Sequence, residues 1–148
     1  MTTDKNLKLD KIDYSDLYFA SFRSDKNYSK EDFLKGFFTI IPGWAKRQMK
    51  MEPLAENSIE KGGKYYFFDV MDVNDVEITL GGSEKTLDYR FSVAFLNSMD
   101  DKYIAVVSTK VKFNSFLGKL SFGIIKPFHK YLVKRVFDNT INAFKGNS

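Results

Sequence analysis

The sequence contains no cysteine and a single histidine. The absence of cysteine excludes disulfide scaffolds, thiolate zinc sites and a cysteine nucleophile. One histidine makes a histidine-based metal site unexpected as well, and no nucleotide fingerprint or catalytic triad is present. We therefore expect neither a metal nor a cofactor. His129 is the only side chain whose ordinary pKa, about 6.5, lies near neutrality.

Long apolar runs are also missing. Residues 1–16 lack the apolar stretch, roughly 7–15 residues long, that a signal peptide requires. No segment approaches the roughly 20 apolar residues of a membrane-spanning helix. These absences predict a protein without a transmembrane helix, and we expect a cytoplasmic location.

Aromatic residues are abundant. The 148 residues include 15 Phe, eight Tyr and one Trp, in a chain of ordinary hydrophobic and charged content. This length suits one domain with one core. Rings supply large surfaces, so the excess indicates either a thick core or the wall of an apolar cavity. Composition alone leaves both interpretations open.

Positive charge is concentrated near the C-terminus. Residues 110–148 hold eight Lys and Arg side chains and one Asp, a net charge of +7, so residues 1–109 carry −3 of the total of +4. A basic segment can contact phosphate or anionic lipid. The alternative is that these lysines only coat the solvent face of a helix.

The first third of the chain predicts a strand followed by a broken helix. We expect a flexible segment over residues 1–13 and a single domain over residues 14–145. Tyr14–Phe22 is aromatic-rich and β-prone, and is predicted to form the first strand. Ser29 and Asp32 have the spacing of a capping box, which predicts a helix start.

Proline and glycine then interrupt the helical pattern. Pro42 and Gly43 predict a kink or a break, because proline disfavours the helical conformation in the residue before it. A second helical piece is expected over Trp44–Met51 and should end at Pro53.

From Lys64 onward the apolar period changes from that of a helix to that of a strand. Four strands are predicted at Lys64–Val70, Val76–Leu80, Thr86–Asn97 and Lys102–Phe113. The expected turns are Gly62-Gly63 before them and Asn74-Asp75, Gly81-Gly82-Ser83 and Met99-Asp100-Asp101 between them. Such short connections predict antiparallel neighbours.

The last part of the chain predicts a long amphipathic helix that ends near Phe144. Its apolar side holds His129 among aliphatic and aromatic residues, and its other side is rich in lysine. Pro127 should lie in the first turn, where its missing N–H is tolerated, so the regular helix is expected to begin near Lys126. Strands set apart from helices predict the α+β class.

Two segments carry a resemblance to a known family. Glu77–Gly82 leading into Leu87–Val93, and Phe113–Lys119 followed by Ile125–His129, resemble uncharacterised bacterial proteins placed in the helix-grip (SRPBCC) superfamily. That superfamily includes START lipid-transfer domains, polyketide cyclases and plant pathogenesis-related proteins. The resemblance covers roughly Tyr14 to Phe144. It implies an antiparallel sheet curved around the C-terminal helix and a ligand cavity between them, and it carries over no catalytic residue.

The residues expected to face that cavity come from the helices and the third predicted strand. They are Phe37, Ile41, Trp44, Tyr89, Phe91, Val93, Phe128, His129, Leu132 and Val136. They line a ligand site if the cavity is open and fill the core if it is not. His129 is either an acid–base group or a helix residue hydrogen-bonded to backbone.

Charges inside strands form a second group of candidates. Asp88 and Arg90 should lie on the face opposite Tyr89, with Glu77 as a cross-strand partner of Arg90. A bulge or twist would instead turn Asp88 and Arg90 into a polar pair that orients a ligand. Together with His129, they are the weak catalytic candidates of the sequence.

Three functions compete at this point. The first is a binding protein for a small, mostly apolar or lipid-like molecule. The second is an enzyme of the cyclase, isomerase or dehydratase type that uses the same cavity. The third is an adaptor that contacts a protein or an anionic surface through Lys126, Lys130 and Lys134. Nucleic-acid binding is not expected, because aromatic stacking residues are not interleaved with those lysines. An open sheet edge allows either a monomer or a dimer.

Overall fold

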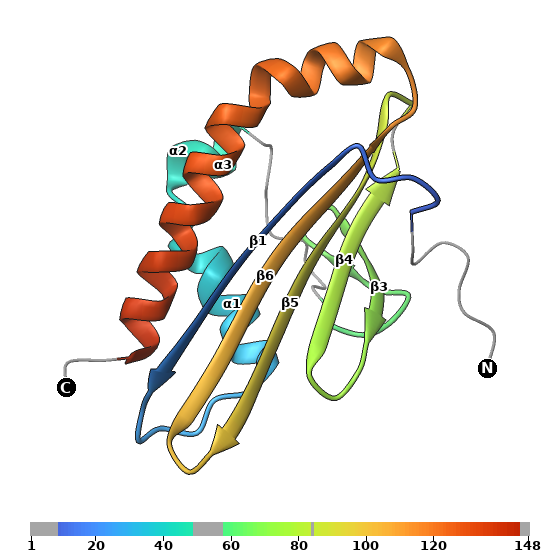
Figure 1. Cartoon of the computed structure of the whole chain (residues 1–148). Helices are drawn as coiled ribbons and strands as arrows, with labels where there is room; N and C mark the ends of the chain where they lie inside the picture. The colour runs from blue at the N-terminus through green and yellow to red at the C-terminus, as the bar shows by residue number, and fades with distance from the viewer. Residues whose placement is uncertain (1–8, 49–57, 84, 146–148) are drawn as a thin grey trace.

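The computed structural model describes residues 9–48, 58–83 and 85–145. Six of its strands form one antiparallel sheet in the order β1-β6-β5-β4-β3-β2, and helices accompany it (Figure 1). The elements are β1 (Tyr14–Arg23), α1 (Lys30–Ile40), α2 (Gly43–Gln48), β2 (Lys64–Tyr65), β3 (Phe68–Val73), β4 (Glu77–Ser83), β5 (Leu87–Met99), β6 (Lys102–Phe113) and α3 (Phe116–Lys145). The predicted α+β class and the antiparallel neighbours are confirmed.

The first and last strands lie side by side. β1 pairs with β6 along its whole length, from Tyr14 opposite Val111 to Arg23 opposite Lys102. β6 also forms a long hairpin with β5, closed by a turn at Asp100 with φ of +51°. β6 is therefore a central strand, and β1 forms one edge of the sheet.

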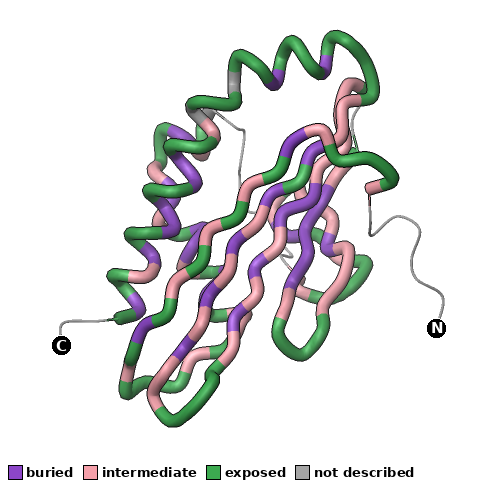
Figure 2. Tube along the Cα trace, viewed as in Figure 1, coloured by how far each residue is buried: buried purple, intermediate pink, exposed green. Residues whose placement is uncertain are grey.

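Alternation along β6 separates the two faces of the sheet. Tyr103, Ala105, Val107, Thr109 and Val111 are buried, and the residues between them are more exposed. This period of two is visible as colour bands along the strands in Figure 2. The buried side is the face that α1 and α3 cover, and it is called the inner face below.

Phe33 of α1 joins the sheet to α3. Its ring stacks on Phe95 of β5 with ring centroids 4.9 Å apart. It also meets Phe137 and Phe144 of α3 edge-on, at 6.4 and 5.3 Å. Aromatic pairs of this geometry add to the energy of burial, so this cluster fixes both helices on the inner face.

The predicted helix start and break are both confirmed. The Ser29 hydroxyl accepts a hydrogen bond from the Asp32 N–H at 3.1 Å, and the Asp32 carboxylate accepts one from the Ser29 N–H at 3.0 Å. α1 ends at Ile40, just before Pro42, and α2 begins at Gly43. The predicted end of the second piece, from residue 49 through Pro53, lies outside the described residues.

The start of α3 was predicted wrongly. The helix begins at Phe116 and contains Pro127, whereas the sequence placed the regular start near Lys126. Phe122 anchors the extra segment, because its ring packs against Tyr14 at 4.9 Å and Phe113 at 5.7 Å. Figure 1 shows α3 bending between its two ends, which is the usual effect of an internal proline.

Two turns also differ from the prediction. Gly81-Gly82-Ser83 is the end of β4, and not a turn. The glycines leave space for β5 side chains, since a Cβ on Gly82 would lie 2.5 Å from the Tyr89 hydroxyl. The predicted strand Lys64–Val70 is instead two strands, β2 and β3, joined by a tight turn in which Tyr66 has a φ of +56°. Tyrosine rarely takes this conformation, so the sequence did not predict a turn at residue 66.

Candidate functional site

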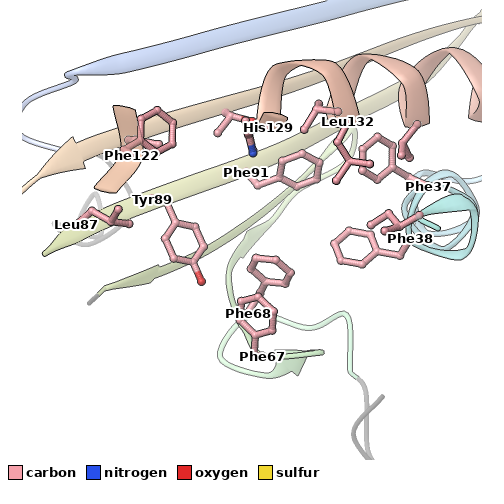
Figure 3. A pocket seen from close by; sticks show the side chains of 15 residues that line it. Phe37, Phe38, Phe67, Phe68, Leu87, Tyr89, Phe91, Phe122, His129 and Leu132 are labelled. Carbon is pink, nitrogen blue, oxygen red and sulfur yellow. The ribbon is translucent and has the colours of Figure 1, made fainter. Parts of the chain in front are cut away.

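A cavity of about 260 Å³ lies between the inner face of the sheet and the two helices α1 and α3. Its wall is apolar except for three side chains with polar atoms, Tyr89, Thr109 and His129. The complete lining is Phe37, Phe38, Ile41, Phe67, Phe68, Leu87, Tyr89, Phe91, Thr109, Val111, Phe122, His129, Leu132, Val133 and Val136. Figure 3 shows these side chains converging from opposite sides.

The spacing of residues along the helices and strands determines which side chains face the cavity. His129, Leu132 and Val136 are spaced at three and four residues, so they share one side of α3. Phe37 lies on α1, and Ile41 is the residue that caps the C-terminal end of that helix. Alternate residues of the paired strands complete the wall, for instance Phe91 on β5 and its partner Thr109 on β6. In Figure 3 the ring of His129 extends from α3 toward Phe91.

Most of the residues predicted to face a cavity are found on this wall. Those that line it are Phe37, Ile41, Tyr89, Phe91, His129, Leu132 and Val136. Val93 is fully buried in the core and does not line the cavity. Trp44 is 50% exposed on α2 and is not one of the lining residues. The side chain of Phe128 lies outside the described part of the structure.

Sequence reasoning missed a further part of the wall. The missed residues are Phe38, Phe67, Phe68, Leu87, Thr109, Val111, Phe122 and Val133. The positions of Phe67 and Phe68 depend on the turn at Tyr66, and a tyrosine gives no sequence signal for such a turn. Thr109 did carry a signal, because it is the one polar member of the inner alternation in β6 between Tyr103 and Val111.

His129 is a partly buried member of the cavity wall. Burial lowers the pKa of its imidazole, and the negative charge of Asp16 raises that pKa by a smaller amount. The group is therefore neutral at pH 7 and can both donate and accept hydrogen bonds. Its Nε2 is buried and has no hydrogen-bond partner among the described residues. The backbone hydrogen bond considered from the sequence is not made by this atom.

Asp16 was not considered from the sequence, yet it lies beside the polar part of the cavity. It is the cross-strand partner of Thr109 in the β1–β6 pair. The Tyr14 hydroxyl donates to Asp16 Oδ2 at 2.7 Å, which orients the carboxylate. Asp16 Oδ1 and Thr109 Oγ1 are both buried, and neither has a partner within residues 9–48, 58–83 and 85–145. Burial and the neighbouring carboxylate raise the pKa of Tyr14, so it remains a hydrogen-bond donor.

The charges predicted inside the strands lie elsewhere. Arg90 is paired with Gly81 and Lys110, and its guanidinium donates to the Tyr89 carbonyl at 2.8 Å. Asp88 accepts a hydrogen bond from the Asn114 amide at 3.0 Å. Neither residue lines the cavity. The expected Glu77–Arg90 pair is wrong, because the register places Glu77 opposite Ala94.

Two further classes of site were sought among the described residues. Within those ranges, no three His, Asp or Glu side chains are grouped so that they could hold a metal ion. None of the described helices combines the length and apolar character needed to cross a membrane.

The fold and the cavity define an α+β protein with an apolar site between a sheet and its helices. The family model described as "Protein of unknown function (DUF2867)" matches residues 37–136. The chain therefore belongs to this family. The matched range begins and ends at cavity residues, Phe37 and Val136, and so spans the whole lining.

A solved structure with a TM-score above 0.5 supports the fold. A hypothetical protein, jhp0584, from Helicobacter pylori is similar with a TM-score of 0.52 and 8% identity, covering 98% of this chain and 95% of that one. A conserved protein from Geobacillus kaustophilus has a TM-score of 0.33 and 7% identity, covering 84% and 96%. No curated protein matches the sequence.

Proposed function

We propose that this protein binds a small, mostly apolar molecule in the cavity between the sheet and α3. The observation that carries the proposal is the cavity itself, about 260 Å³ in volume and lined by aromatic and aliphatic side chains. Concave, apolar sites with a few polar groups are the usual form of small-molecule sites. No catalytic group is needed for this function.

The volume limits the size of the ligand. An apolar cavity of about 150 Å³ accepts benzene, so the larger cavity here is suited to a molecule of roughly ten to twelve heavy atoms. A long-chain lipid would require the cavity to widen. A bicyclic aromatic compound, or a chain of similar volume, fits the rings of Phe37, Phe91 and Phe122 that form much of the wall.

We also propose that the fold is of the helix-grip type. The support is the order of elements, with a helix pair after the first strand and a long last helix packed on one face of a twisted antiparallel sheet (Figure 1). The ligand sites of that superfamily lie between sheet and terminal helix, which agrees with the position of the cavity found here.

The test begins with native mass spectrometry of the protein as purified, compared with its mass after denaturation. A mass excess that disappears on denaturation is the expected result and gives a formula for the ligand. Naphthalene then serves as a defined apolar probe, whose binding is followed by its fluorescence. Absence of both a bound molecule and naphthalene binding would reject the proposal.

A cavity-filling variant links binding to this site. Val136→Phe adds about four carbon atoms to a buried lining position and should abolish naphthalene binding. Val76→Phe is the matched control, because Val76 is 40% exposed beside the β3–β4 turn. Thermal unfolding of both variants checks that overpacking, which costs about 1–3 kcal/mol, has not unfolded the protein.

A second candidate function is contact with an anionic lipid surface through the first half of α3. Phe116, Leu120 and Ile124 are more than half exposed and recur every four residues, so they form a stripe on one helical side. Figure 2 shows most of this part of α3 exposed. Lys119 and Lys126 are exposed on the same segment. An apolar stripe bordered by lysine is the pattern of helices that lie at a membrane interface.

Vesicle sedimentation tests this second function. Vesicles that contain phosphatidylglycerol should bind the protein, and the bound fraction should fall as salt is added. The double variant Leu120→Ser, Ile124→Ser should lose binding, whereas Leu17→Ser, Phe19→Ser should not, since those exposed residues lie on β1. Equal binding to phosphatidylcholine vesicles, or none to either, would count against an anionic-surface function.

A further inference from the structure

Three buried polar atoms belong to neighbouring positions on β1, β6 and α3. They are Asp16 Oδ1, Thr109 Oγ1 and His129 Nε2, and none has a hydrogen-bond partner among the described residues. They are also the whole set of such side-chain atoms in the described ranges. Buried polar groups are nearly always hydrogen-bonded. Thr109 and His129 line the cavity, and Asp16 is the strand partner of Thr109, so the three unsatisfied atoms indicate a common external partner.

Register and electrostatics place the three groups together. Asp16 and Thr109 are direct cross-strand partners, and such pairs have Cβ atoms about 4.5–5.5 Å apart. The charge of Asp16 acts on His129, and the ring of His129 lies 6.2 Å from that of Phe122, which itself packs on Tyr14. Thr109 and His129 line the cavity directly, and Thr109 is only 5% exposed.

The chemistry of the three groups defines what can satisfy them. The carboxylate of Asp16 only accepts hydrogen bonds, the hydroxyl of Thr109 donates and accepts, and the neutral ring of His129 offers one nitrogen of each kind. A hydroxyl group of a ligand can donate to one of these atoms and accept from another. A carboxylate or phosphate would instead enter an apolar site beside the negative charge of Asp16, which is unfavourable.

We propose that this polar cluster, Asp16, Thr109 and His129, binds the hydroxyl group of a neutral alcohol or phenol whose apolar body fills the cavity. This inference rests on the proposed binding function and adds the ligand class to it. The cluster selects for an alcohol or phenol over a hydrocarbon of the same shape, and selects against the corresponding carboxylate.

Three probes with one ring system test the selection, namely 2-naphthol, naphthalene and 2-naphthoate. The wild-type protein should bind 2-naphthol roughly 10-fold more tightly than naphthalene, the effect of one hydrogen bond to a buried group. It should bind 2-naphthoate most weakly of the three. Equal affinity for 2-naphthol and naphthalene would overturn the inference and leave the binding function standing. Failure of all three probes to bind would overturn both.

Variants of Thr109 test whether the preference for 2-naphthol comes from the polar cluster. Thr109→Val should remove most of the preference for 2-naphthol without changing naphthalene affinity by more than about 2-fold, and Thr109→Ser, which keeps the hydroxyl, should retain the preference. Thr79→Val is the matched control. Thr79 is equally buried, but its hydroxyl lies near that of Ser92, at 3.3 Å, and it does not line the cavity. A preference unchanged in Thr109→Val would contradict the inference.

Asp16→Asn is expected to increase the affinity for one probe, whereas Thr109→Val is expected to remove a preference. Removing the charge should improve 2-naphthoate binding by roughly 10-fold or more, while naphthalene binding stays constant. A purely structural role for Asp16 would instead weaken all three probes together, and that result would contradict the inference. Thermal unfolding of each variant confirms that it is folded before binding is compared.

Discussion

Asp16 on β1 lies opposite Thr109 on β6, although 93 residues separate them in the sequence. The pairing of the first strand with the last brings an acidic side chain next to Thr109 in the wall of a cavity whose lining comes mainly from α1, β3, β5, β6 and α3. The family model matches residues 37–136, which contain the whole lining but not β1. The Asp16 carboxylate therefore comes from outside the matched segment. The ligand preference proposed above therefore depends on the edge strand.

The stability of the protein should fall between pH 7 and pH 5. Burial lowers the pKa of His129 in the folded protein, whereas in the unfolded chain it returns to about 6.5. Below that value the unfolded chain binds more protons than the folded one, so acid favours unfolding. Urea unfolding at several pH values should show this loss, and His129→Gln should reduce the slope in this range.

Asp13 gives a control in a separate pH range. Its carboxylate accepts a hydrogen bond from the Phe113 N–H at 2.7 Å, which holds its pKa below the ordinary value of 3.8. The associated stability is present above that value and lost as the pH falls through the lower, folded-state pKa. Asp13→Asn should therefore leave the slope between pH 5 and pH 7 unchanged. A slope in that range that survives in His129→Gln would contradict the assignment to histidine.

Removal of the Phe33 ring should be among the most destabilising single changes. The side chain is fully buried and contacts rings from both β5 and α3. Phe33→Ala should lower the free energy of unfolding by about 3–5 kcal/mol. Phe19→Ala, at a position that is 73% exposed on β1, should change it by less than about 0.5 kcal/mol. Similar losses in both variants would argue against the described packing of α1.

The parts of this structure that were predictable are those set by local pattern. The capping box at Ser29 and Asp32 and the strand over Lys102–Phe113 follow from spacing along the chain, and both were predicted. The start of α3 was not, because the tertiary contact of Phe122 with Tyr14 outweighs the local effect of Pro127. Tertiary context overrides propensity in this way.

The polar cluster illustrates the limit for the site. His129 and a part of the aromatic wall, Phe37, Tyr89 and Phe91, were identifiable from helix and strand periodicity. Asp16 was not, since the register of β1 against β6 is set by a long-range pairing and not by a hairpin turn. The local sequence gave one sign of a polar contact opposite Asp16, namely Thr109, a threonine among the apolar inner residues of β6.

Two glycines of α3 should respond in opposite directions to the same substitution. Gly118 is buried, and a Cβ there would clash with the carbonyl oxygen of Thr86. That carbonyl cannot move freely, because it accepts a hydrogen bond from the Asn114 N–H at 2.8 Å. Gly118→Ala should therefore destabilise the protein by about 1–3 kcal/mol.

Gly123 is exposed on the same helix, and a Cβ there would meet nothing within 4 Å. Alanine is the better helix former, so Gly123→Ala should stabilise the protein by about 0.5–1 kcal/mol. Urea unfolding of the two variants measures both effects. If Gly118→Ala were stabilising too, α3 would not approach Thr86 as closely as described, and the segment that carries Phe122 to the cavity would be placed differently. Opposite signs would support the close approach of α3 to the β4–β5 connection.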